Sequence, residues 1–206
     1  MAGELITLIL AAGASRRMGK PKALLSWGNQ TVLRHLLNEV QGSGPGAILV
    51  VTGAHREAIE KEIPGGMAHT CHNPDWQEGM GVSLSTGIRA LEQLFPDAGA
   101  VLVMLVDQPL VTAAYLRQLR KEHQAYPESI IATSYGAFAG VPAVFPKNFW
   151  GALKGLSADR GAKGLIEAHK GRCRVLEAGE AITDIDTPEA YRRALQKAGM
   201  EADNKG

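Results

Sequence analysis

Short runs of apolar residues recur along the chain, and segments with helical spacing separate most of them. The runs are rich in branched side chains and lie at residues 5–10, 47–51, 100–106, 129–133, 141–145 and 181–185. Runs of this length predict strands, and their alternation with helical segments predicts an α/β fold. We expect a three-layer, Rossmann-like sheet that is mostly parallel, with one reversed strand and helices on both faces.

The segment 31–41 predicts a helix that packs on this sheet. Its apolar side chains fall on one helical face: Val32, Leu33, Leu36, Leu37 and Val40. Thr31 is suited to be the N-cap, and Gly42 lies just past the expected end.

Residues 101–106 are apolar on both sides of the pleat, which is typical of a central parallel strand covered by helices on both faces. Asp107 follows this strand directly. In open α/β sheets, ligands bind outside the carboxyl ends of the strands, where helix N-termini point inward. We therefore expect Asp107 to lie beside the loop that follows Leu10.

Composition limits the classes of partner. The 206 residues are 45% hydrophobic, and 22 basic residues nearly balance 21 acidic ones. The length and apolar fraction predict a single domain over residues 1–200, and the polar segment 201–206 is expected to be a disordered tail. The balanced charge predicts no nucleic-acid or membrane partner. Cys71 and Cys173 form no CxxC pair, and the first apolar run is too short to span a bilayer, so a cytoplasmic protein is expected.

Two other groups of residues carry chemistry that a site could use. His69, Cys71 and His72 are soft metal ligands, but no fourth ligand has a fitting spacing, and the segment is interpreted as an edge strand or loop. The tryptophans are spread without basic residues between them, which disfavours a platform for single-stranded nucleic acid.

The loop after the first strand has the composition of a triphosphate site. Residues 10–22 have the sequence LAAGASRRMGKPK. Gly13 and its small neighbours leave backbone N–H groups open to a phosphate, and Arg17 and Lys22 supply positive charge. The loop matches neither the Walker A pattern nor GxGxxG. On composition alone, a basic surface turn without function is the alternative.

This loop resembles the signature of the MobA-like nucleotidyltransferases, and its Ala-Ala-Gly form is similar to that of the molybdenum cofactor cytidylyltransferases. Further matches follow in order along the chain: VTGA at 51–54, NPDW at 73–76, GMGVSL at 79–84, DQPL at 107–110, GVPAVF at 140–145, DRGA at 159–162 and DIDTPE at 184–189. The resemblance runs nearly end to end and implies a fold like that of the nucleotide-diphospho-sugar transferases.

The resemblance implies roles for three charged residues. Arg17 would neutralise the β- and γ-phosphates, and Lys22 would contact the α-phosphate as the acceptor phosphate attacks and pyrophosphate leaves. Asp107 would hold Mg²⁺, the expected cofactor, because this hard cation prefers carboxylate and phosphate oxygens. An aspartate before Pro109 is also suited to a plain turn.

A second carboxylate is expected to complete the metal site. Asp184 and Asp186 would project to the same side of a strand. Asp186 is favoured and Asp184 stays open; Asp186 and Thr187 can also cap the helix that begins at Pro188.

The resemblance also assigns the two substrates to segments of the chain. The nucleotide would contact Leu10, Ala11, Ala12, Gly13, Ser15, Arg17, Lys22, Thr52, Gly53, Gly79, Ser83 and Asp107. The acceptor would contact Gly140, Pro142, Asp159, Arg160 and Gly161, with Arg160 or Lys163 meeting a phosphate. Ser83 lies near the expected start of a helix at Val82, so a plain helix cap explains it nearly as well.

The implied reaction is transfer of a nucleoside monophosphate, from CTP, to molybdenum-loaded molybdopterin. Ala12 replaces the second glycine of the guanylyltransferase form, and its methyl group would narrow the base pocket against a purine. GTP as donor, a sugar or alcohol phosphate as acceptor, and a molybdenum cofactor carrier or chaperone are the alternatives. A transient contact with a molybdenum hydroxylase or its maturation factor is the expected partner interaction.

Overall fold

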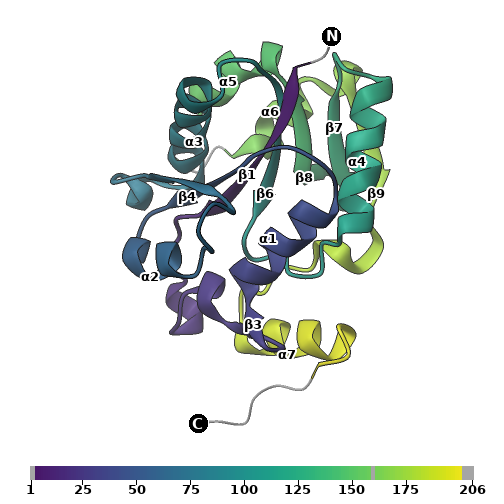
Figure 1. Ribbon diagram of the computed structural model, residues 1–206. Coiled ribbons are helices and arrows are strands. Elements are labelled where there is room, and N and C mark those ends of the chain that lie inside the picture. The colour runs from purple at the N-terminus through teal and green to yellow at the C-terminus, as the bar shows by residue number, and fades with distance from the viewer. Residues whose placement is uncertain (1–2, 159–160, 201–206) are drawn as a thin grey trace.

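A seven-stranded sheet forms the centre of the computed structural model, which describes residues 3–158 and 161–200 (Figure 1). Its strands are β1 (Glu4–Ala11), β4 (Ile48–Thr52), β5 (His69–His72), β6 (Ala98–Leu105), β7 (Ile130–Ser134), β8 (Ala139–Pro146) and β9 (Cys173–Glu177). They lie in the order β5-β4-β1-β6-β8-β7-β9, and β8 runs antiparallel to both of its neighbours while the other pairs are parallel. The predicted sheet, mostly parallel with one reversed strand, is confirmed.

Helices cover both faces of the sheet. On one face lie α1 (Val32–Gly42) and α4 (Ala113–Ala125); on the other lie α3 (Met80–Leu94), α5 (Trp150–Lys154) and α6 (Ala162–Ala168). Successive β1 side chains enter opposite layers, since Ile9 packs with α1 and α4 whereas Leu8 packs with α3 and α5. The three-layer α/β architecture is confirmed.

Smaller elements surround the carboxyl end of the sheet. They are the hairpin of β2 (Ser26–Trp27) and β3 (Gln30–Thr31), α2 (Arg56–Lys61), and α7 (Pro188–Lys197). The Tyr191 hydroxyl of α7 donates to the carbonyl of Ser26, which ties the last helix to the hairpin. Short 3-10 turns occur at Arg16–Met18, Lys22–Leu24, Trp76–Glu78, Lys147–Phe149, Lys170–Arg172 and Gly179–Ile182.

Strand β6 occupies the middle of the sheet, as its two-sided apolar pattern predicts. Residues 101–104 have no exposed surface. At its carboxyl end, the Val106 amide donates to the Leu10 carbonyl at 3.2 Å. Asp107 and the loop after β1 are therefore neighbours, as expected.

The strand predicted at residues 181–185 is wrong. This segment begins inside the 3-10 turn Gly179–Ile182 and is irregular from residue 183, and the last strand is β9, at Cys173–Glu177. Ile185 is fully buried, and its amide donates to the Asp107 carbonyl at 2.9 Å, so the segment crosses the end of β6 without joining the sheet.

Two helix boundaries differ slightly from expectation. Thr31 caps α1 as predicted, since its hydroxyl accepts from the Arg34 amide, but Gly42 is the last residue of that helix. Helix α3 begins at Met80, two residues before the expected start, so Ser83 lies inside its first turn and is not the cap. Among the described residues, no helix combines the length and apolar composition needed to cross a membrane.

Candidate active site at the carboxyl ends of β1 and β6

A cleft of about 580 Å³ opens where β1 and β6 end. Its walls come from the loop after β1, the start of α3, the end of β6 and the segment before α7. The lining residues are Leu10, Ala12, Gly13, Ala14, Ser15, Lys22, Trp76, Gln77, Gly79, Met80, Ser83, Leu105, Val106, Asp107, Asp184 and Asp186. The topology thus brings four sequence segments together at one edge of the sheet.

The loop after β1 folds back on itself around Ser15. Ser15 adopts a left-handed backbone conformation, with φ of 50°, and its hydroxyl accepts from the Lys22 amide at 3.0 Å. Gly19 also has a positive φ, which permits the turn between the two 3-10 segments. This fold directs the Lys22 side chain back into the cleft.

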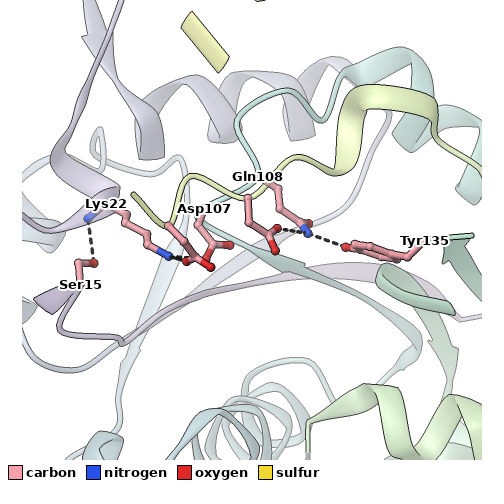
Figure 2. Close-up of polar contacts among 7 residues, drawn as sticks. Ser15, Lys22, Asp107, Gln108 and Tyr135 are labelled. Atoms are coloured by element: carbon pink, nitrogen blue, oxygen red, sulfur yellow. Dashed lines mark hydrogen bonds and ion pairs between the residues drawn. The ribbon is translucent and has the colours of Figure 1, made fainter. Parts of the chain in front are cut away.

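Lys22 lies between two aspartates, as Figure 2 shows for its contact with Asp107. Its Nζ donates to Asp107 Oδ2 at 2.8 Å and also to Asp186 Oδ1. Only 14% of the Lys22 side chain is exposed. Burial disfavours the charged ammonium, but the ion pairs with Asp107 and Asp186 outweigh that effect, so the pKa of Lys22 lies above its ordinary value.

The two carboxylate oxygens of Asp107 differ in their contacts. Its Oδ1 is buried and accepts no hydrogen bond from the described residues. A buried oxygen of this kind is costly unless a ligand or ion satisfies it. No cluster of three or more His, Cys, Asp or Glu side chains arranged for a metal occurs among the described residues, so protein ligands alone would leave most positions of a cation open.

Asp184 faces a different partner. The Nε2 of Gln108 donates to Asp184 Oδ1 at 2.9 Å and to the Tyr135 hydroxyl at 2.6 Å (Figure 2). That hydroxyl donates to the Val141 carbonyl at 2.5 Å. Partial burial raises the pKa of Asp184, the charges of Asp107 and Asp186 raise it further, and the bond from Gln108 partly offsets the rise. Asp184 and Asp186 both line the cleft, on either side of buried Ile185.

A second, mostly apolar pocket of about 190 Å³ adjoins the cleft. It shares Leu10, Met80, Leu105 and Asp184 with the cleft. Its outer wall is the turn between β7 and β8, where the rings of Tyr135 and Phe138 stack with centroids 4.9 Å apart. The Lys163 ammonium lies 3.5 Å from the centroid of the Phe138 ring at the rim.

The residues predicted to bind the nucleotide divide into three groups. Leu10, Ala12, Gly13, Ser15, Lys22, Gly79, Ser83 and Asp107 line the cleft, and Arg17 lines a smaller hollow of about 200 Å³ beside it. Ala11, Thr52 and Gly53 are buried outside the cleft lining. Thr52 is the last residue of β4, and its hydroxyl donates to the Cys71 carbonyl, so its side chain is engaged within the sheet.

Of the predicted acceptor residues, Gly140 and Gly161 line the second pocket. Pro142 is buried in β8, and its carbonyl accepts from the Thr133 hydroxyl. Asp159 and Arg160 lie outside the described residues, as does the tail predicted at 201–206.

Sequence reasoning missed several lining residues. Trp76, Gln77 and Met80 line the cleft, and Tyr135 and Phe138 line the second pocket. Trp76, Gln77 and Met80 lie in or beside two matched motifs, so their positions in the sequence could have identified them. The turn with Tyr135 and Phe138 lies outside every motif.

Comparison with known proteins identifies the family. The model of the MobA-like NTP transferase domain matches residues 7–173. The chain belongs to this family. It is therefore a nucleotidyltransferase of the MobA-like class, as the first loop predicted.

Three relatives align over nearly their whole length. The purine catabolism protein PucB of Bacillus subtilis is 33% identical, over 93% of this chain and 97% of its own. Nicotine blue oxidoreductase of Paenarthrobacter nicotinovorans is 27% identical over 91% and 95%. The crystal structure of Rv0371c from Mycobacterium tuberculosis superposes with a TM-score of 0.82 at 28% identity, over 95% and 99%; Rv0371c has also been solved with manganese.

Proposed function

We propose that this nucleotidyltransferase transfers the nucleoside monophosphate of CTP to molybdenum-loaded molybdopterin, with Mg²⁺, and releases pyrophosphate. The observation that carries the proposal is the position of Lys22 between Asp107 and Asp186 on the floor of a cleft bounded by the Gly13 loop. One cation and two carboxylates at the carboxyl end of a central strand are suited to holding a triphosphate and a metal.

Asp107 and Asp186 are the residues that would hold the metal. They share the Lys22 ammonium, and Asp107 has a buried oxygen that finds no partner within residues 3–158 and 161–200, which fits a hard cation. Asp184 is engaged by Gln108, which favours Asp186 as the second ligand. Bound Mg²⁺ would supply positive charge to the triphosphate and the leaving pyrophosphate.

The loop around Gly13 is suited to the phosphates. A β-carbon on Gly13 would meet no protein atom within 4 Å, and the φ of Gly13 is not in the left-handed region, so protein packing gives no reason for glycine there. Close approach of a ligand to the backbone is the remaining physical reason. Lys22 would then stabilise the charge on the α-phosphate as an acceptor oxygen attacks phosphorus and the bond to pyrophosphate breaks.

The choice of CTP rests on Ala12. Ala12 belongs to the cleft wall and is only 5% exposed, so the wall cannot easily yield to a larger base. Arg17, in the adjoining hollow, would extend the positive charge toward the β- and γ-phosphates.

The second pocket would receive the acceptor ring. It is mostly apolar, adjoins the cleft through Asp184 and Met80, and has the stacked rings of Tyr135 and Phe138 on its wall. A planar ring fits between aromatic and aliphatic surfaces of this kind, and Lys163 at the rim is available to a phosphate. A sugar phosphate would gain less from these apolar walls.

The name of one relative, nicotine blue oxidoreductase, describes a redox reaction. Lys22, Asp107 and Asp186 favour phosphoryl chemistry, because a hydride transfer has no need of two carboxylates around an ammonium.

Initial rates of pyrophosphate release test the proposal. Purified protein with Mg²⁺ is given molybdenum-loaded molybdopterin, metal-free molybdopterin or a sugar phosphate, and each acceptor is combined with CTP, GTP or ATP. We expect the highest rate with CTP and loaded molybdopterin. A higher rate with GTP would refute the donor assignment, and release only with the sugar phosphate would refute the acceptor assignment.

A further inference from the structure

The Lys22 ammonium occupies the position between the two carboxylates that are proposed to hold the metal. We propose that Lys22 is a substitute cation, which holds Asp107 and Asp186 together in the free protein and must leave them before a divalent metal binds. Nucleotide and metal would therefore bind cooperatively. This inference rests on the proposed function and concerns the order of events in the same site.

The two cations compete for the same pair of carboxylates. Nζ of Lys22 donates to one oxygen of Asp107 at 2.8 Å and to one oxygen of Asp186. A metal bound by the same two oxygens would lie close to the present position of Nζ. Two positive charges so close together repel strongly where solvent screening is weak, as it is beside Lys22 and Asp107, whose side chains are 14% and 19% exposed; Asp186, on the outer side, is 53% exposed.

The Lys22 ammonium satisfies only one of the two carboxylate oxygens of Asp107. The ammonium satisfies Oδ2, but Oδ1 is buried and without a partner in the described part of the chain. An ammonium offers three donors along a flexible stem, whereas a divalent cation accepts several oxygen ligands at once. The ammonium therefore neutralises the site without saturating it.

Lys22 can move without unfolding the loop. Its backbone is held by the bond from its amide to the Ser15 hydroxyl and begins the 3-10 turn Lys22–Leu24. The four-carbon stem above this anchor is flexible. Gly13 and Ala14 line the same cleft, so a phosphate bound beside them would offer the ammonium a new negative partner.

Cooperativity follows by linkage. A nucleotide that draws Lys22 onto its phosphates frees both carboxylates and raises their affinity for metal, and the metal raises the affinity for nucleotide by the same factor. If Lys22 were only a structural ion pair, with the metal binding elsewhere, its removal would leave the affinity for metal unchanged.

The test measures Mn²⁺ binding to the full chain without nucleotide, by the electron paramagnetic resonance signal of free Mn²⁺. The variants are Lys22→Met, which removes the charge, Lys22→Arg, which keeps it, and Lys20→Met, a matched control at an exposed lysine of the same loop. We expect Lys22→Met to bind Mn²⁺ about tenfold more tightly than wild type, and the other two to bind like wild type. Equal or weaker binding by Lys22→Met overturns the proposal.

A measurement on the wild type covers the case in which Lys22→Met does not fold. In protein labelled with ¹³C-lysine, the Cε signal of Lys22 is assigned by its loss in Lys22→Arg. We expect it to stay in place with Mg²⁺ alone and to shift when Mg²⁺ is added with a non-hydrolysable CTP analogue. A full shift with Mg²⁺ alone, or no shift with both, contradicts the exchange.

The two proposals can fail separately. If wild type releases pyrophosphate while Lys22→Met binds Mn²⁺ no more tightly, the substitute-cation role is refuted and the transferase assignment stands. If Lys22→Met gains affinity while no donor and acceptor react, the proposed reaction is refuted and the exchange stands.

Discussion

A β-carbon on Gly53 would lie 2.5 Å from the carbonyl oxygen of Ala12. That carbonyl also accepts from the Ala54 amide at 3.0 Å, so the segment after β4 packs directly against the backbone of the nucleotide loop. Gly53 thus supports the loop through close packing, whereas Gly13, one residue after Ala12, has open space where its side chain would be.

This contrast predicts opposite results for two glycine substitutions. Gly13→Ala should leave the free energy of unfolding within about 0.5 kcal/mol of wild type, because alanine fits the backbone and meets no atom. It should weaken nucleotide binding by about tenfold or more, since the methyl group occupies ligand space. Gly53→Ala should destabilise the fold by about 2 kcal/mol.

Chemical denaturation and nucleotide titration by calorimetry measure both quantities. If Gly13→Ala bound nucleotide like wild type, the phosphates would not approach the loop at this residue, and the proposed donor geometry would be wrong.

Removing the Ala12 methyl group should relax the choice of donor. We expect Ala12→Gly to raise the ratio of kcat/KM for GTP over CTP by about tenfold, as expected for one methyl group in a fitted pocket. Comparing both donors on the same preparation cancels any loss of folded protein. An unchanged ratio would show that base selection lies elsewhere in the cleft.

Substitutions of the two aspartates before α7 should lower kcat/KM to very different extents. Asp186→Asn should lower kcat/KM by about 100-fold, because it removes a ligand of the metal and a partner of Lys22. Asp184→Asn should change it less than about tenfold, since an amide oxygen can still accept from Gln108. Steady-state rates across a Mg²⁺ titration distinguish them, because only the Asp186 variant should require more Mg²⁺; the reverse order would make Asp184 the ligand.

Tyr135 should make stability depend on pH in the alkaline range. Burial raises its pKa to about 12, although the bond from Gln108 opposes the rise. An acid whose pKa is raised by folding leaves stability unchanged below its unfolded pKa of about 10, and stability then falls as pH rises toward the folded value, by about 1 kcal/mol per unit. Urea denaturation of wild type and Tyr135→Phe between pH 9.5 and 11.5 measures this. A constant difference between the two proteins would mean that the phenol is not held neutral.

The sequence patterns predicted the buried strands well and the exposed ones poorly. Strand β6 is apolar on both faces because helices cover both, and that pattern is local. Strand β9 pairs only with β7, at the edge of the sheet, and Arg174 and Val175 are exposed, so it carries no clear apolar run. Residues 181–185 form an apolar run and so resemble a strand in the sequence. Ile185 is indeed buried, but against the end of β6 and outside the sheet.

The candidate site was predictable where it follows a strand end and not where it depends on a turn. Lys22 and Asp107 are 85 positions apart, yet both belong to motifs at the carboxyl ends of neighbouring strands. The link from Gln108 to Tyr135 depends on the turn between β7 and β8, where the Tyr135 amide donates to the Phe138 carbonyl at 2.8 Å. Nothing in the local composition predicts that this turn forms a wall of the second pocket.

The most direct test follows the nucleotidyl group itself. Wild type and Asp107→Ala are each mixed, in excess, with molybdenum-loaded molybdopterin and CTP labelled at the α-phosphate, with Mg²⁺ or with a chelator. In wild type with Mg²⁺, the label should move into a pterin dinucleotide, with one pyrophosphate per transfer, and neither chelated nor Asp107→Ala protein should form it. Label that stays in CTP or appears as free CMP, or equal transfer by Asp107→Ala, would contradict the account.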